Sequence, residues 1–127
     1  MTVTWISARL QPTEDPGKVE QAIRNIFGEI ELETKQGVVS ARLEGLEALS
    51  GLRGRIAQDR IRDTVKTVFT RWAEGDLLSF GLNRQAAYAG HVSLNLKGED
   101  PMGPIQVRVE GDVQSLITYL CEKTMLR

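Results

Sequence analysis

The sequence predicts an α+β domain of two layers, in which helices pack on one face of a mainly antiparallel, mixed sheet. Two patterns carry this prediction. Several short segments alternate apolar and polar residues, as half-buried strands do, and the segments between them place apolar residues three or four positions apart, as amphipathic helices do. Their order is strand, helix, two strands, helix, three strands, helix. No repeat or linker interrupts it, so we expect residues 1–127 to form a single domain.

The first strand is expected at residues 3–10, which alternate throughout. A helix follows it. Thr13 or Asp15 can cap this helix, and Pro16 suits its first turn, where a missing N–H costs nothing. The buried stripe of this helix, which a glycine ends, consists of Val19, Ala22, Ile23, Ile26 and Phe27.

The middle of the chain predicts a hairpin and then helices. Residues 29–33 alternate glutamate with apolar residues, which indicates a strand with an acidic outer edge, and a turn at 35–37 leads into a returning strand at 39–43. Gly51 and Gly54 interrupt a leucine-rich helical stretch and are interpreted as helix breaks. One long helix is then expected over residues 55–74, with a stripe of Ile61, Val65, Val68 and Trp72.

Three strands and a helix complete the predicted fold. The strands are expected at residues 78–82, 92–96 and 105–109, and residues 98–101 form the hairpin loop between the last two. Asp112 caps the final helix. Its apolar stripe is Val113, Leu116, Ile117, Leu120 and Cys121.

Composition excludes several classes of function. The formal net charge is −1, so no global basic field attracts nucleic acid or a membrane. No apolar run approaches the roughly 18 residues of a membrane span, and the start of the chain lacks the features of a signal peptide. The single cysteine rules out an intramolecular disulfide. We therefore expect a cytoplasmic protein.

No set of residues converges on catalysis or on a metal. His91 is the only histidine and falls on the outward side of its predicted strand, and Cys121 lies on an apolar helix stripe. Glu14 and Asp15 form a carboxylate pair, which the start of a helix explains through capping and the macrodipole. We expect a protein that is not an enzyme and holds no cofactor or metal.

The most basic segment is the predicted long helix. Between Leu52 and Trp72 six basic residues stand against two acidic ones, a net charge of +4 against −5 for the rest of the chain. On a helical projection, one row consists of Arg55, Arg62 and Lys66, and another of Arg53, Arg60 and Arg71. The first row is a candidate for phosphate contacts. Asp59 and Asp63 can equally pair with these cations at i+3 and i+4 spacings, which leaves an ordinary salt-bridged helix.

The outward face of the predicted sheet suggests a second possibility. Stacking aromatic residues, which single-strand-binding sheets carry, are missing there except for Trp5. The remaining outward side chains of the last three strands are small or polar. Such a face suits a protein partner or a second copy of the chain, so self-association is the alternative to RNA binding.

Two stretches resemble a family of small, uncharacterised archaeal proteins, described as predicted RNA-binding, exosome-associated proteins. The first runs from Pro12-Thr13-Glu14-Asp15 into Val19, Ala22-Ile23 and Asn25-Ile26-Phe27. The second is Phe80-x-Leu82-Asn83-Arg84-Gln85-Ala86-Ala87, followed by Gly90 and Gly103-Pro104-Ile105. The resemblance covers about residues 8–124. Arg84 stands where the family often has Lys, and Met102 where Leu is usual.

The resemblance implies a fold like that of the ribosomal protein that binds 5S RNA, and an RNA partner. It implies no catalytic residue and no cofactor. The segment 83–85 has two interpretations. Asn83 can cap a helical turn through Ala87, or the loop can present Arg84 and Gln85 to RNA. The candidate RNA-contacting residues are therefore Arg55, Arg62, Lys66, Arg84 and Gln85.

Overall fold

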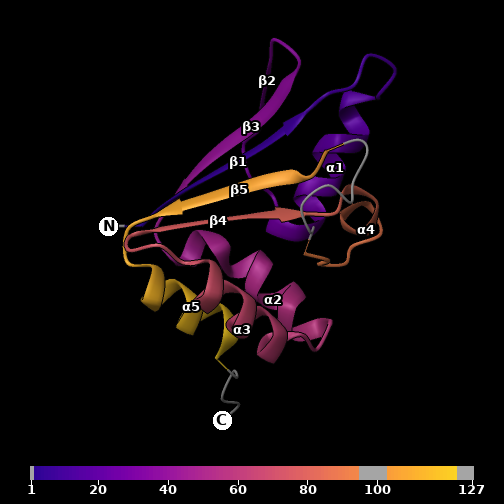
Figure 1. Cartoon of the computed structure of the whole chain (residues 1–127). Coiled ribbons are helices and arrows are strands. Elements are labelled where there is room, and N and C mark those ends of the chain that lie inside the picture. The colour runs from indigo at the N-terminus through magenta and orange to yellow at the C-terminus, as the bar shows by residue number, and fades with distance from the viewer. Residues whose placement is uncertain (1, 95–102, 123–127) are drawn as a thin grey trace.

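The computed structural model describes residues 2–94 and 103–122 and has the predicted α+β architecture. Helices pack against one face of a five-stranded sheet (Figure 1). The strands are β1 (Val3–Arg9), β2 (Glu33–Lys35), β3 (Val38–Glu44), β4 (Leu77–Leu82) and β5 (Ile105–Glu110). The helices are α1 (Pro16–Phe27), the short 3-10 helix η1 (Glu47–Leu49), α2 (Ser50–Gln58), α3 (Arg62–Trp72), α4 (Arg84–Tyr88) and α5 (Val113–Cys121).

The strand order in the sheet is β2-β3-β1-β5-β4, so the first strand of the chain lies at the centre. All four strand pairings described are antiparallel. The parallel component that we expected in a mixed sheet is absent from this part of the chain. Short connections and the cover of helices on one side explain the pattern, because an antiparallel sheet can leave its other face in water.

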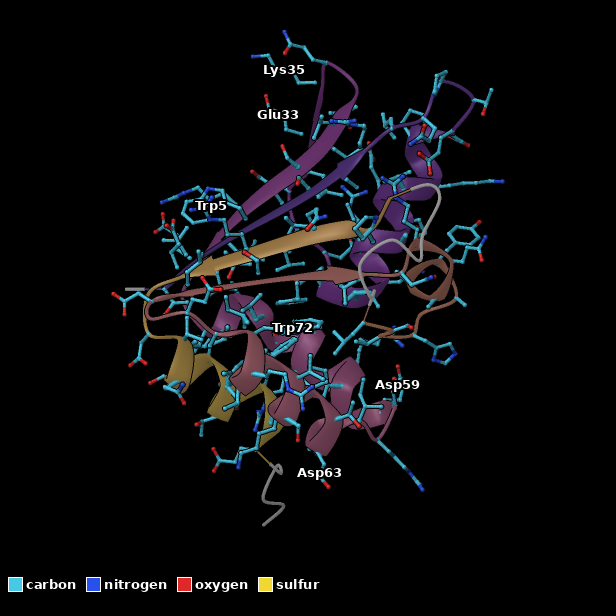
Figure 2. All side chains as sticks on the ribbon, in the orientation of Figure 1. Trp5, Glu33, Lys35, Asp59, Asp63 and Trp72 are labelled. Atoms are coloured by element: carbon cyan, nitrogen blue, oxygen red, sulfur yellow. The ribbon has the colours of Figure 1, made fainter. Side chains whose placement is uncertain are left out.

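Alternation along the strands decides which face is covered. In β1, Thr4, Ile6 and Ala8 are buried, whereas Trp5 between them is exposed. The inward side chains of β3, β4 and β5 join the stripes of α1, α2, α3 and α5 in one hydrophobic cluster. Figure 2 shows Trp5 on the side of the sheet away from α3, and Trp72 on the helix side. No described helix or strand covers this open face of the sheet.

The predicted helix starts are confirmed at two aspartates. Asp15 accepts a hydrogen bond from the Gly17 amide at 2.9 Å, and Pro16 occupies the first turn of α1. Asp112 accepts one from the Ser115 amide at 3.0 Å at the start of α5. Each cap satisfies a backbone donor that the helix leaves unpaired.

The single long helix predicted over residues 55–74 is wrong, since α2 and α3 are separate. Arg60 lies between them in the left-handed region, with φ 57°. Its amide donates to Ala57 O at 3.1 Å and the Ile61 amide donates to Ile56 O at 3.2 Å, which is the pattern of a Schellman motif. This motif usually carries glycine at the left-handed position. Because arginine stands there instead, the sequence gives no signal that the helix ends.

Two predicted strands are also corrected. The strand expected at 29–33 begins only at Glu33, although Ile30 and Leu32 still pack against the core. Of the strand expected at 92–96, the described residues 92–94 form only an isolated bridge between Leu82 and Leu94. The Val92 amide is taken by the carboxylate of Asp59 at 2.8 Å, so it cannot join a strand ladder. Residues 95–102, including the expected hairpin loop, lie outside the described part of the chain.

Gly51 and Gly54 do not break a helix, because both lie inside α2. A side chain on Gly51 would approach the backbone of Phe27 to 2.6 Å, so this glycine permits the end of α1 to pack closely on α2. A side chain on Gly54 would meet nothing within 4 Å. No helix in the described part of the chain is long and apolar enough to cross a membrane.

Candidate nucleic-acid interface

Arg62 and Lys66 lie one turn apart on α3. Lys66 is exposed and Arg62 is half-buried. Neither takes part in an ion pair within residues 2–94 and 103–122, and the same holds for Arg60 at the turn before α3. These cations therefore keep their charge available to an outside anion.

Neither of the aspartates that we considered as their partners forms an ion pair with them in the described part of the chain. Asp59 accepts the Val92 amide and lies with Oδ1 3.1 Å from His91 Nδ1. Asp63 sits in the first turn of α3, where its charge suits the helix dipole, at the end of the helix away from the sheet (Figure 2). The alternative of a fully salt-bridged helix is thus not what the described structure contains.

The environment of Asp59 sets its ionisation. Burial raises the pKa of this carboxyl group, but hydrogen bonds from the Val92 amide and His91, and the charges of His91 and Arg55, outweigh it. The net result is a pKa below the ordinary value. Asp59 is therefore charged at neutral pH and ties the segment after α4 to the end of α2.

Arg55 is a bridge between helices. Its Nε donates to the carbonyl oxygen of Asn25 in α1 at 2.8 Å, and its Nη1 donates to Gln58 Oε1 at 3.2 Å. Arg55 also lies on α2, whereas Arg62 and Lys66 lie on α3. The predicted row of Arg55, Arg62 and Lys66 does not exist, because the Schellman motif rotates α3 out of line with α2.

Arg84 is buried, with 7% of its surface exposed. Its Nη1 donates to both carboxylate oxygens of Glu14, at 2.7 and 2.8 Å, and its Nη2 donates to the carbonyl oxygen of Arg9. The interpretation of Asn83 as a helix cap is confirmed, since its Oδ1 accepts the Ala86 amide at 2.9 Å. Of Glu14 and Asp15, only Asp15 caps α1 through its side chain, and Glu14 is the counterion of Arg84.

Gln85 is exposed beside a shallow hollow of about 440 Å³ between α1 and α4. Lys18 from α1 and Tyr88 from α4 line the same hollow. The structure therefore distributes the five predicted residues over three places: α3, the contact of α2 with α1, and the contact of α4 with α1.

The two stretches that carry the family resemblance touch each other. Asn25 Nδ2 donates to the carbonyl oxygens of Ala87 at 3.2 Å and Tyr88 at 2.9 Å, and Glu14 binds Arg84. These contacts fasten α4 to α1. The most recognisable residues of the sequence thus serve the fold, and a binding surface has to be sought among less distinctive exposed residues.

The comparisons with known proteins decide the family. A family model described as RNA binding matches residues 5–111. The chain belongs to this family. It is 37% identical to the "UPF0201 protein" of Sulfurisphaera tokodaii over 98% of this chain and 90% of the relative. It is 38% identical to the UPF0201 protein of Pyrobaculum aerophilum over 88% of this chain and 83% of the relative.

Solved structures of the UPF0201 family share the fold. A crystal structure of an uncharacterised UPF0201 protein superposes with a TM-score of 0.81 at 26% identity, covering 96% of this chain and 94% of the other. The UPF0201 protein from Methanococcus jannaschii has a TM-score of 0.78 at 26% identity, covering 94% and 98%. The archaeal family that the two stretches resemble is therefore the correct one.

The remaining groups that could carry chemistry are the Cys121 thiol and possible metal ligands. Burial raises the pKa of the Cys121 thiol, and the nearby Lys66 and Arg62 lower it by less. Such a thiol is a weak nucleophile at neutral pH. Within the described residues, no three His, Cys, Asp or Glu side chains gather as metal ligands do.

Sequence reasoning missed two features of the surface. Arg60 is presented by a left-handed turn that no glycine marks. On the open face, Trp5 lies directly between Arg42 and Arg108 of the neighbouring strands. The strand order was needed to see this, because β1 and β5 lie about a hundred residues apart in the sequence and adjacent in the sheet.

Proposed function

We propose that this protein is a non-catalytic RNA-binding protein that serves as an accessory in RNA processing. The observation that carries the proposal is the group of Arg60, Arg62 and Lys66 around the start of α3, none of which has an ion-pair partner among the described residues. Membership of a family described as RNA binding supports RNA as the anion.

The chemistry of this group fits phosphate. Arginine and lysine bind phosphate oxygens through charge-assisted hydrogen bonds, and binding releases counterions from the nucleic acid. Sequence-independent contacts of this kind need no aromatic residue. We therefore assign phosphate contact to the cations of α3 rather than base recognition.

The remaining predicted residues take different roles in the proposal. Gln85, beside Lys18 and Tyr88, offers a second contact at the hollow between α1 and α4. Arg55 connects α2 to α1 and Arg84 connects α4 to the residues before α1, so we assign both a structural role. Association with the exosome, a fold like the 5S-RNA-binding ribosomal protein and a cytoplasmic location stay predictions that belong to this proposal.

The test is fluorescence anisotropy with labelled single-stranded, structured and duplex RNA at low salt. We expect Arg62→Glu/Lys66→Glu to weaken binding at least tenfold, because two attractive phosphate contacts become repulsive. The matched control is Arg42→Glu/Arg108→Glu, which changes the net charge equally but lies on the open sheet face. Equal losses in both variants would show a general charge effect and remove α3 as the site.

A further inference from the structure

The open face of the sheet carries charges in two adjacent rows. Direct cross-strand neighbours form an arginine row across β3, β1, β5 and β4, consisting of Arg42, Trp5, Arg108 and Ser79. Two residues further along each strand lies a glutamate row, consisting of Glu44, Val3, Glu110 and Leu77. In each row, one apolar residue of the central strand β1 therefore lies between two residues of the same charge.

The charges of both rows are accessible. Arg42 lies within ion-pair distance of Glu44 on the same strand, and Arg108 Nη2 lies 3.3 Å from Glu110 Oε1. Their side chains nevertheless remain 45–57% exposed, and Trp5 is 37% exposed at the centre. Exposed strand pairs of this kind contribute little to folding, so the rows keep most of their capacity to bind a partner.

This pattern is complementary to itself. A two-fold axis parallel to the strands would place glutamate on glutamate. A two-fold axis can instead run perpendicular to the strands, in the plane between the two sheets and midway between the two rows. It places the arginine row of each copy over the glutamate row of the other. Arg42 and Arg108 then face Glu44 and Glu110 of the second copy, and Trp5 faces its Val3.

We propose that a second copy of this chain covers the open face, with the arginine row of each copy against the glutamate row of the other. The contact is isologous, as most homodimer interfaces are. Trp5 supplies the apolar centre and the charges form its border, which is the usual composition of a specific interface.

RNA fits this face less well than a second copy does. A base stacked on Trp5 lies between Arg42 and Arg108, but the glutamate row is only one pleat repeat, about 7 Å, away. A nucleic-acid strand that runs from Trp5 toward Val3 therefore carries its next phosphate past Glu44 and Glu110. Those carboxylates repel phosphate, whereas a second copy supplies an arginine to each of them. Binding of RNA on this face is therefore a competing outcome of the test.

The size of the contact predicts a reversible dimer. Four strands across and about four residues along the strands give a footprint of roughly 20 by 14 Å. That is below the area of a standard interface, about 800 Å² per partner. Association should therefore appear with rising protein concentration and should weaken at high salt.

The test is sedimentation velocity of the full chain from about 10 to 500 µM, a range that suits a small interface. Arg42→Glu/Arg108→Glu places glutamates against glutamates, and Glu44→Arg/Glu110→Arg places arginines against arginines. We expect each variant alone to dissociate at least tenfold more readily than the unchanged protein. An equimolar mixture of the two should form a heterodimer, since every facing pair is again of opposite sign.

A matched mixture excludes attraction by net charge alone. Arg62→Glu/Lys66→Glu changes the net charge as Arg42→Glu/Arg108→Glu does, but keeps the open face, and it should not form this heterodimer with Glu44→Arg/Glu110→Arg. Circular dichroism melting confirms that each variant is folded. A Trp72→Phe variant leaves Trp5 as the single tryptophan, and its emission should shift to the blue as the dimer forms.

Three results would overturn the proposal. The unchanged protein could remain monomeric over the whole range, it could associate with no sensitivity to the row variants, or the mixture could fail to restore association. Loss of RNA binding in Arg42→Glu/Arg108→Glu by a protein that stays monomeric would assign the face to RNA. Loss of RNA binding only in Arg62→Glu/Lys66→Glu would leave the dimer intact, so the two proposals fail separately.

Discussion

At the scale of single residues, the structure separates cations that serve the fold from cations that remain available. Arg84 and Arg55 both donate hydrogen bonds to acceptors inside the chain. Arg62 and Lys66 have no such partner in the described structure. Residue type cannot make this distinction, because all four are basic residues of the same helical layer, and the partners Glu14 and Asn25 come from distant parts of the sequence.

The ion pair of Arg84 with Glu14 leads to a prediction of stability. Arg84→Met leaves the Glu14 carboxylate half-enclosed without its counterion, so we expect the free energy of unfolding to fall by about 3 kcal/mol. Chemical denaturation measures it. The control is Gln85→Ala at the exposed residue next to Arg84, which should change the free energy of unfolding by less than about 0.5 kcal/mol. An equal loss in both variants would mean that the ion pair has no special role.

Asp59 leads to a prediction of pH dependence. Its pKa is lower in the folded state, so its contribution to stability is present above the pKa of the unfolded chain and is lost as the pH falls through the folded value. We expect stability to decline below about pH 4, and to decline less steeply in Asp59→Asn. Denaturant titrations from about pH 6 to pH 3 measure both slopes. Parallel slopes would rule out Asp59 as a contributor.

At the scale of elements, local patterns predicted what local interactions determine. Alternation located β1, β3, β4 and β5, and the caps Asp15 and Asp112 located two helix starts. The break between α2 and α3, and the lack of a strand at residues 92–94, could not be predicted in this way. The first depends on a left-handed arginine, and the second on an aspartate 33 positions away that takes the Val92 amide.

The same limit explains the predicted site. The row of Arg55, Arg62 and Lys66 assumed one continuous helix, so the error in the fold became an error in the site. The family resemblance identified the correct family, but its residues lie in the contact between α1 and α4. A surface such as the arginine and glutamate rows arises only from the strand order, which the sequence does not state.

Two glycines of α2 provide a matched prediction at this scale. Gly54→Ala should raise the free energy of unfolding by about 0.5–1 kcal/mol, because alanine favours an exposed helix position and meets no neighbour there. Gly51→Ala should lower it by about 1–3 kcal/mol, because the added methyl group collides with the Phe27 backbone. Thermal or chemical denaturation distinguishes the two, and a stabilising Gly51→Ala would disprove the close helix contact.

At the scale of the whole molecule, the two faces carry different kinds of charge. Around the start of α3 the helix layer carries cations that have no ion-pair partner among the described residues, which suits a polyanion. The open sheet face alternates arginine and glutamate rows, which suits a second copy of the same face. A dimer formed through the sheet would hold two α3 surfaces on its outer sides, so RNA binding and self-association can occur together.

The most direct test of the central claim is the salt dependence of RNA affinity. With phosphate contacts from Arg60, Arg62 and Lys66, the logarithm of the association constant should fall with the logarithm of salt concentration with a slope of about −2. Arg62→Glu/Lys66→Glu should reduce this slope to below about 1 in magnitude, while Arg42→Glu/Arg108→Glu should preserve it. An unchanged slope in the α3 variant, or no RNA binding by the unchanged protein at low salt, would contradict the account.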